Sequence, residues 1–384
     1  MEHQTIPLPA QRSETSLQRV RVWDRFVRAF HWSLVGAMAV AFATSLLLPK
    51  EWALIHVIDG TACVALVAAR LVWGWLGPEY ARFAAFVRGP TAVVAHLRDI
   101  AAGRVHRHRG HNPLGAAMIV ALLAGVVVLG VTGTATLGGT LKSGPLAFAL
   151  SFATGSTARE VHELVAYAVL GLIAAHVAGA IFESRRTREN LAVSMVTGLK
   201  EARPGDEVPA AVPAHAVLAA ILSVALFAGS GLAVATLMKR PALGAPVAAL
   251  DASYKKECGD CHIAYHPSLL PAAQWTAVMD GLARHFGENA TLPAATAAPI
   301  RSYLIANAAE TFDTLAANAF RRVSATDPLR ITAAPFWQRT HDEIPDAVFK
   351  AKPVKSKSNC AACHSDAATG MFQPWNIDIP EAVQ

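Results

Sequence analysis

The sequence predicts an all-α protein in which five membrane-spanning helices are followed by a small, mostly helical polar domain. Three observations support this prediction: 53% of the 384 residues are hydrophobic, only 16% are charged, and the mean hydropathy is +0.34. Such a composition is not that of an ordinary soluble enzyme. The net charge of +6 could suggest binding to nucleic acid. The basic residues, however, lie between apolar runs and are not interleaved with aromatics, so nucleic-acid binding is not indicated.

The membrane spans follow from the length of the apolar runs. A transmembrane helix needs roughly 20 apolar residues to cross the hydrocarbon layer. Five stretches have this length, namely 27–48, 52–76, 113–136, 159–182 and 215–238. The third begins at Pro113 and the fifth follows Pro213, and proline suits the first turn of a helix.

The loop charges predict the orientation, because short loops rich in Lys and Arg stay in the cytoplasm. Fifteen Lys and Arg residues lie in 1–26, 77–112 and 183–214. The intervening loops, 49–51 and 137–158, contain Lys50 and Lys142 alone. We therefore expect a multi-pass protein of the bacterial inner membrane with a cytoplasmic N-terminus and with residues after 240 in the periplasm.

The same pattern predicts the domain organisation. The expected parts are a cytoplasmic tail (1–26), a four-helix membrane domain (27–200), a loop end with a fifth membrane helix (201–240), a linker (241–250) and a periplasmic domain (251–384). An alternative is that the first span is a signal peptide, because "AFA" at 41–43 resembles a small-residue cleavage site. Its apolar run is longer than a signal core, and cleavage would remove His31.

Four histidines lie inside the predicted spans: His31, His56, His162 and His176. An ionisable residue in a membrane span indicates a functional site. His162 and His176 are 14 residues apart, which on an α-helix places them within about 40° of one face and about 21 Å apart. Matching depths pairs His56 with His162 and His31 with His176, and each pair could bind one metal ion between two helices. The alternatives are hydrogen bonds between helices or a proton relay.

Other residues of the membrane part have simpler interpretations. His215, at the start of the fifth span, is expected at the membrane interface. His106, His108 and His111 lie in a basic loop and are interpreted as solvated residues in preference to a metal site. Cys63 lies in an apolar run and is expected to be a small buried side chain.

The C-terminal part contains the spacing C-x-x-C-H twice, as Cys258, Cys261 and His262 and again as Cys360, Cys363 and His364. In this motif two thiols attach a haem covalently and the histidine binds its iron. Structural zinc or disulfides are the alternatives. Zinc would use these six residues poorly, and cysteines at this spacing form strained disulfides.

Each such iron needs a second axial ligand or an open position. The candidates are His266, His285, His341, Met279 and Met371. His285 follows His262 by 23 residues and His341 precedes His364 by 23 residues, which favours them, although the two pairs could be crossed. His266 follows His262 too closely to reach the opposite face of the same iron. It could reach only the iron of the second motif.

Two resemblances to known families follow from these motifs. "VWDRFVRAFHW" at 22–32, "GHNPLGA" at 110–116 and the H-x13-H helix resemble the bacterial cytochrome b561 family, which includes the b-type subunits of hydrogenases. The resemblance covers about residues 20–200. It implies a four-helix bundle with two b haems, bound by His31, His56, His162 and His176, that exchanges electrons with the quinone pool.

Most of residues 251–384 resemble the soluble dihaem cytochromes c with two bis-histidine haems, through "YKKECGDCHIAYHPSLLPAAQW", "HFGE" and the late C-x-x-C-H. The "YHP" segment departs from the pattern at His266. The fold class expected is therefore a membrane four-helix haem bundle plus a fifth transmembrane helix, followed by a mostly α-helical dihaem cytochrome c domain.

The expected function is that of a tetrahaem cytochrome, with two b and two c haems, that passes electrons from membrane quinol to a periplasmic cytochrome or terminal reductase. The lysines that precede the second motif could attract an acidic partner: Lys350, Lys352, Lys355 and Lys357. One alternative is oxidation of superoxide or reduction of a small ligand at a haem. Another is a cytochrome b subunit of a larger complex such as a hydrogenase.

Overall fold

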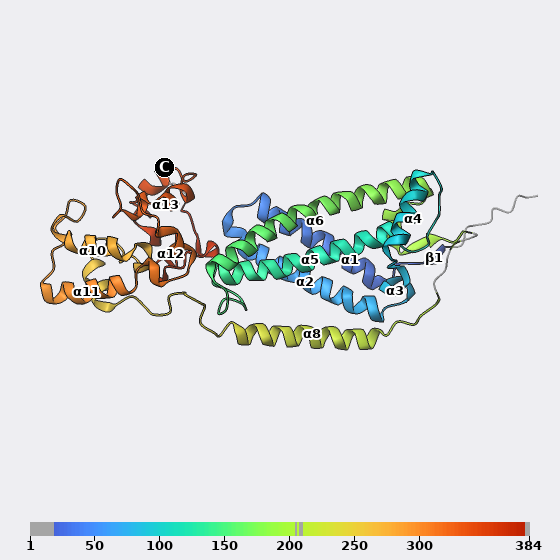
Figure 1. Cartoon of the computed structure of the whole chain (residues 1–384), viewed down its shortest axis with the longest axis horizontal. Coiled ribbons are helices and arrows are strands. Elements are labelled where there is room, and N and C mark those ends of the chain that lie inside the picture. Colours follow the sequence, from blue (N-terminus) through green and yellow to red (C-terminus); the bar gives the residue numbers. More distant parts are fainter. Residues whose placement is uncertain (1–18, 204–205, 207–209, 381–384) are drawn as a thin grey trace, which may run out of the picture. The chain divides into compact units, whose positions relative to one another are not determined.

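Nearly all of the regular secondary structure in the computed structural model of the chain is helical (Figure 1). It describes residues 19–203, 206 and 210–380. Residues 1–18 of the predicted N-terminal tail, including Arg12, lie outside the described residues.

Five helices have the length and composition needed to cross a membrane, as the sequence predicted. They are α1 (Arg25–Leu46), α2 (Ala53–Leu76), α5 (Pro113–Gly139), α6 (Phe152–Thr187) and α8 (Ala216–Leu237). A 3₁₀ turn, η1 (Lys50–Trp52), precedes α2. Large apolar side chains such as Val131, Leu164 and Val217 are more than 60% exposed. Exposed apolar area on this scale suits helices that face lipid, and the protein is an integral membrane protein.

The fourth span is longer than predicted. Helix α6 begins seven residues before 159 and continues five residues past 182. Apart from Phe152, its additional N-terminal residues are small or hydroxylated, and its last turn contains Arg185 and Arg186, which interact favourably with the carbonyl end of a helix. Hydropathy locates only the apolar centre of such a helix, which explains the difference.

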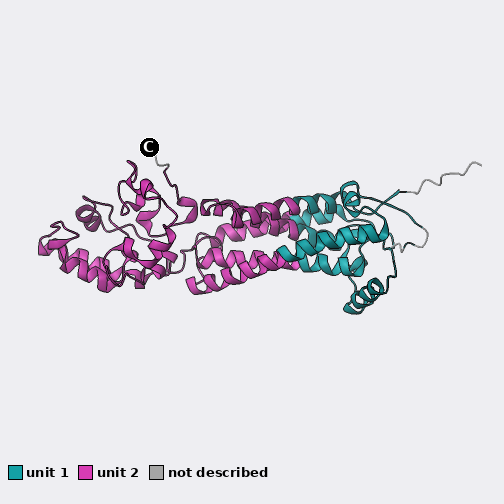
Figure 2. Cartoon of the chain, turned by 90° about the horizontal axis from the view of Figure 1, so that it is seen from above, with its two compact units in different colours: residues 1–33, 68–123, 170–223 teal, residues 34–67, 124–169, 224–384 magenta. Residues whose placement is uncertain are grey.

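The chain divides into two compact units (Figure 2). Unit 1 comprises residues 1–33, 68–123 and 170–223. Unit 2 comprises residues 34–67, 124–169 and 224–384. Each long helix therefore contributes residues to both units.

In unit 1 the loops between the spans are folded, whereas the sequence predicted only solvated segments there. The strands β1 (Arg19–Arg21) and β2 (Leu199–Glu201) pair antiparallel. The remaining elements are η2 (Glu79–Ala81), α3 (Phe83–Phe86), α4 (Pro90–Ala101) and α7 (Leu191–Thr197). Arg107 forms ion pairs with Glu189 (2.8 Å) and with Asp206, and so connects two loops far apart in sequence.

In unit 2 the residues after 250 form short helices and 3₁₀ turns. The helices are α9 (Ala252–Cys258), α10 (Ala272–Asp280), α11 (Ala294–Ala306), α12 (Leu315–Phe320), α13 (Pro335–Thr340) and α14 (Asp346–Lys350). The 3₁₀ turns are η3 (Pro267–Leu269), η4 (Leu282–Arg284), η5 (Ala309–Thr311), η6 (Ile331–Ala333), η7 (Cys360–Ala362), η8 (Ala367–Thr369) and η9 (Pro374–Asn376). Their core includes Leu269, Trp275, Ile300 and Leu304, all 5% exposed or less.

The end of α5 and the start of α6 are in backbone contact through two glycines. A Cβ atom placed on Gly155 would lie 2.5 Å from the Thr140 nitrogen and 2.6 Å from a Gly139 backbone carbon. Contacts this short leave no room for a side chain, as at the small-residue interfaces of membrane helices.

We expect Gly155→Ala to destabilise the helical bundle by about 1–3 kcal/mol, because the added methyl group overpacks this contact. Gly171→Ala, also in α6, is the matched control, since a Cβ there meets nothing within 4 Å. The measurement is the midpoint temperature of unfolding in detergent. Equal midpoints for the two variants would contradict the close contact.

Candidate functional site

The structure brings the four span histidines together in two pairs. In unit 1 the rings of His31 (α1) and His176 (α6) have their centroids 6.5 Å apart. In unit 2 the centroids of His56 (α2) and His162 (α6) are 6.2 Å apart. These are the two pairs that the matching of depths predicted.

The histidines of the two C-x-x-C-H motifs are also paired. The ring centroid of His262 lies 6.2 Å from that of His285. The ring centroid of His364 lies 6.1 Å from that of His341. The uncrossed pairing is therefore the one in the structure.

All four separations lie between 6.1 and 6.5 Å, and this range has a physical meaning. Two imidazoles that bind one metal ion from opposite sides through bonds of about 2.0 Å have their ring centres roughly 6.3 Å apart. The pairs therefore have the separation that bis-histidine coordination of an iron requires.

The hydrogen bonds of the rings suit the same role. Nδ1 of His56 lies 3.1 Å from the Ala41 carbonyl, and Nδ1 of His162 lies 3.1 Å from the Leu129 carbonyl. Similar contacts join His262 Nδ1 to Ile263 O (2.7 Å) and His341 Nδ1 to Trp337 O (2.9 Å). An Nδ1–H that donates to a carbonyl leaves Nε2 free as the metal ligand.

Two other rings have a buried nitrogen with no bond to a carbonyl. Nδ1 of His31 and Nδ1 of His364 are buried and have no hydrogen-bond partner among the described residues. A buried ring nitrogen without a partner is costly.

Local backbone structure positions the C-terminal pairs. His285 and Glu288 exchange two backbone hydrogen bonds across Phe286 and Gly287, both with positive φ, as in a tight two-residue hairpin turn. His341 follows α13 and stacks on Trp337 at 4.4 Å. The His364 N–H donates to the Cys360 carbonyl at 2.8 Å, so the second motif makes one helical turn.

Burial lowers the pKa of His285, of His341 and of His364. For His285 and His364 the charge of the paired histidine lowers the pKa further. A lowered pKa keeps the imidazole neutral, and the neutral form is the one that binds a metal ion. The four motif cysteines, Cys258, Cys261, Cys360 and Cys363, form no disulfide with any described residue.

The other candidates for a second axial ligand are packed or bonded within the domain. His266 is 3% exposed, its Nδ1 accepts the Ser268 N–H (3.2 Å), and its ring lies 5.4 Å from that of Phe312. Burial lowers its pKa to about 4. Met279 packs against the hydrophobic core of the domain, and Met371 is partly buried.

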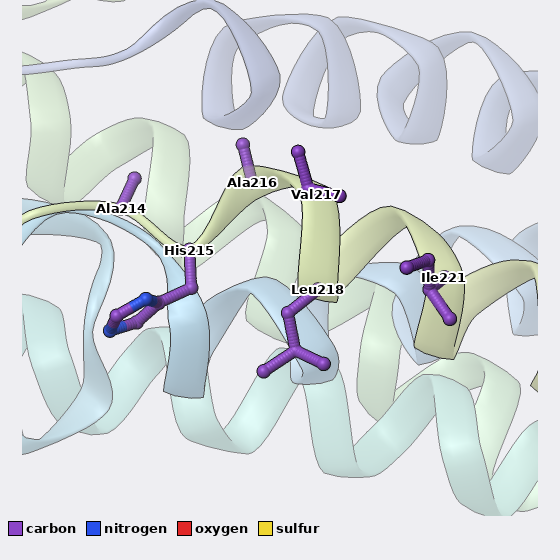
Figure 3. Close-up of a pocket in the computed structure, with 6 residues that line it drawn as sticks. All are labelled: Ala214, His215, Ala216, Val217, Leu218 and Ile221. Atoms are coloured by element: carbon purple, nitrogen blue, oxygen red, sulfur yellow. The ribbon is translucent and has the colours of Figure 1, made fainter.

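The remaining histidines divide into surface and packed residues. His215 lies in a shallow hollow of about 390 Å³, and Figure 3 shows that its lining residues come from the start of α8 and from the two residues before it. His106 lies 3.7 Å from Asp99. His111, interpreted from the sequence as solvated, is instead packed between Trp23 (4.5 Å) and Phe86 (4.6 Å). Cys63 is buried, as predicted.

Sequence reasoning missed the threonines beside the span histidines. Thr44 Oγ1 lies 3.1 Å from His56 Nδ1, and Thr132 Oγ1 lies 3.1 Å from His162 Nδ1. The available signal was a hydroxyl inside an apolar span, where threonine often bonds only its own helix.

The comparisons with known proteins cover both parts of the chain. Residues 22–198 match the family model of prokaryotic cytochrome b561. Residues 254–372 match the model of dihaem cytochrome c. No curated protein matches the chain in sequence.

Three solved structures match the C-terminal part. A dihaem cytochrome c from Rhodobacter sphaeroides is 43% identical (33% of this chain, all of that chain, TM-score 0.29). The DHC purified from the same organism is 41% identical, with the same coverage and a TM-score of 0.27. The dihaem cytochrome sb-DHC of Shewanella baltica is 37% identical (34% of this chain, 93% of that chain, TM-score 0.28).

The two family models show the kinds of domain to which the two parts of the chain correspond. The C-terminal part of the chain belongs to the dihaem cytochrome c family and the N-terminal part is a prokaryotic cytochrome b561 domain, so the protein is a membrane haem cytochrome of electron transfer.

Proposed function

We propose that the chain binds four haems and passes electrons from membrane quinol to a periplasmic acceptor. The observation that carries the proposal is the common ring separation of the four histidine pairs, between 6.1 and 6.5 Å. When bound, haem iron supplies one-electron chemistry, and the protein supplies its ligands and surroundings.

Each pair has its own haem in this proposal. His31 with His176 and His56 with His162 hold the two b haems. His262 with His285 and His364 with His341 hold the two c haems, which are attached through Cys258 and Cys261 and through Cys360 and Cys363. Two histidines at every iron leave no open position, which favours an electron carrier over superoxide or small-ligand chemistry at a haem.

Contacts within unit 2 support transfer between the bundle and the C-terminal domain. Lys142, in the loop before α6, has a fully buried side chain and its Nζ lies 3.0 Å from Asp313. The same carboxylate accepts the Phe152 N–H at 2.7 Å. Although burial would raise the pKa of Asp313, these hydrogen bonds lower it, so the ion pair persists at neutral pH.

The chemistry of quinol and the predicted topology support this direction of transfer. Oxidation of one quinol releases two electrons and two protons, and the electrons leave singly. The excess of Lys and Arg in alternate loops favours a bacterial inner-membrane protein with a cytoplasmic N-terminus. Five crossings then put residues 251–384 in the periplasm, where a soluble cytochrome or terminal reductase would accept the electrons.

We expect the purified protein to contain two b haems for every two c haems. His162→Ala and His176→Ala should each lose one b haem, because each removes one ligand of a different pair, while the covalent c haems stay as an internal standard. Pyridine haemochrome spectra measure the ratio. A protein without b haem, or two variants that keep both, would refute the bundle sites.

The wild type and the two histidine variants also test whether electrons pass from quinol through the b haems to the c haems. Quinol added to the wild type should reduce both kinds of haem, and reduction of the c haems should slow in both variants. Reduction of the c haems at the wild-type rate in a variant that has lost a b haem would exclude transfer through the bundle.

His285→Ala should convert one c haem to a five-coordinate form that binds CO, because the second imidazole is lost. His266→Ala is the control, and it should keep both c haems low-spin, since His266 bonds Ser268 and packs on Phe312. Optical spectra with and without CO distinguish the two. CO binding in the His266 variant, but not in the His285 variant, would reverse the assignment.

The exposed lysines before the second motif are the proposed docking site for an acidic partner. Lys352→Glu with Lys355→Glu should slow electron transfer to an acidic one-electron carrier by about tenfold at low salt and less at high salt. Lys255→Glu with Lys256→Glu is the control, because these lysines are also exposed. Stopped-flow reoxidation of the c haems gives the rates. Equal slowing in both double variants would indicate only a general charge effect.

A further inference from the structure

Unit 1 contains a buried cation that forms no ion pair with any described residue. Arg70, in α2, is 3% exposed. Its Nη2 donates to the Ala81 carbonyl at 3.0 Å and its guanidinium lies 4.9 Å from the centre of the Phe83 ring. Its Nη1 is buried and has no hydrogen-bond partner among the described residues. A buried guanidinium in this state is costly unless an anion binds it.

The carboxylate that interacts electrostatically with Arg70 forms its hydrogen bonds with other groups. Asp24 interacts electrostatically with Arg70. Its Oδ1 accepts the Val27 N–H (2.9 Å) and its Oδ2 accepts the Trp73 indole N–H (3.1 Å). Asp24 therefore leaves Nη1 of Arg70 free for another acceptor.

A second unpaired polar atom lies close by. Nδ1 of His111 is buried without a partner, and ring contacts connect His111 through Phe86 (4.6 Å) and Phe83 (5.8 Å from Phe86) to the Arg70 guanidinium. Burial, with the charges of Arg70, Lys200 and His176, lowers the pKa of His111 to about 3. Its neutral ring can therefore donate or accept a hydrogen bond beside an anion.

Helix geometry gives the depth of Arg70. It follows His56 on α2 by 14 residues, the same interval that separates His162 from His176 on α6. The side chains at this interval share one face of the helix and are about 21 Å apart along it. Arg70 is therefore on the face that carries His56, at the depth of the His31–His176 pair.

We propose that Arg70, with His111 beside it, binds a propionate carboxylate of the b haem held by His31 and His176. Haem b carries two ionised propionates, and a guanidinium with a free N–H is the strongest carboxylate donor that a side chain offers. This inference rests on the proposed haem site of that pair and not on the direction of electron transfer.

Redox titration of the b haems in the full-length protein tests the proposal. Loss of a nearby positive charge destabilises the ferrous state, so Arg70→Gln should lower one b-haem midpoint potential. We expect about a tenfold change in the one-electron equilibrium, which corresponds to about 59 mV. Arg70→Lys should restore much of this shift, and Arg98→Gln, at an exposed position of α4, should leave both potentials unchanged.

The affected haem is identified by combining variants. In a His162→Ala background only the b haem of His31 and His176 remains, and Arg70→Gln should shift its potential. In a His176→Ala background the remaining haem should not respond. If either double variant does not fold, the Arg70→Gln variant alone still tests the proposal. Its titration gives the midpoint potentials of the two b haems, and its ratio of b to c haem shows whether a b haem is lost.

The proposal fails if Arg70→Gln leaves both potentials and the haem ratio at wild-type values, or if the haem of His56 and His162 shifts instead. It also fails if the change matches that of Arg98→Gln. A wild type without b haem would instead overturn the proposed function, so the two failures are distinguishable.

Discussion

An imidazole inside a membrane bundle is costly unless its ring nitrogens find partners, and the helices around His56 and His162 supply partners for one nitrogen of each ring. On His56 and His162 one nitrogen is paired with a backbone carbonyl and a threonine hydroxyl. The other nitrogen is available to a metal ion, and the facing helix supplies the second ring about 6.2 Å away. The bundle thus holds two rings at a separation that suits a shared metal ion.

The same constraint shows why the fold and most of the site were predictable. Hydropathy located the five spans because lipid requires long apolar helices. The period of the α-helix predicted that His162 and His176 lie on one face of their helix. The depth of each histidine in the membrane then predicted which histidine of another span it faces. The C-x-x-C-H spacing predicted two haem-attachment sites, and the equal intervals to His285 and His341 indicated the ring pairs that the structure contains.

What the sequence could not supply depends on contacts between distant segments. His111 lies in a run of charged loop residues, and only the fold shows that Trp23 and Phe86 enclose its ring. Arg70 sits near the end of an apolar span, where an arginine usually extends to the interface. Its burial and the free Nη1 atom are visible only after the loop carrying Ala81 and Phe83 has folded over it.

The surroundings of the two span histidine pairs have different electrostatic consequences. A buried arginine accompanies one pair, whereas the rings of the other pair bond carbonyl and hydroxyl groups. A positive charge near a haem favours the reduced state, whereas neutral donors and acceptors affect both states less. The His31–His176 site, with Arg70, would then hold its electron more tightly than its histidine ligands alone dictate. The His56–His162 site has Asp59 on the same helix, and a negative charge there would act in the opposite sense. Two sites with the same pair of ligands can in this way differ in potential through the side chains around them.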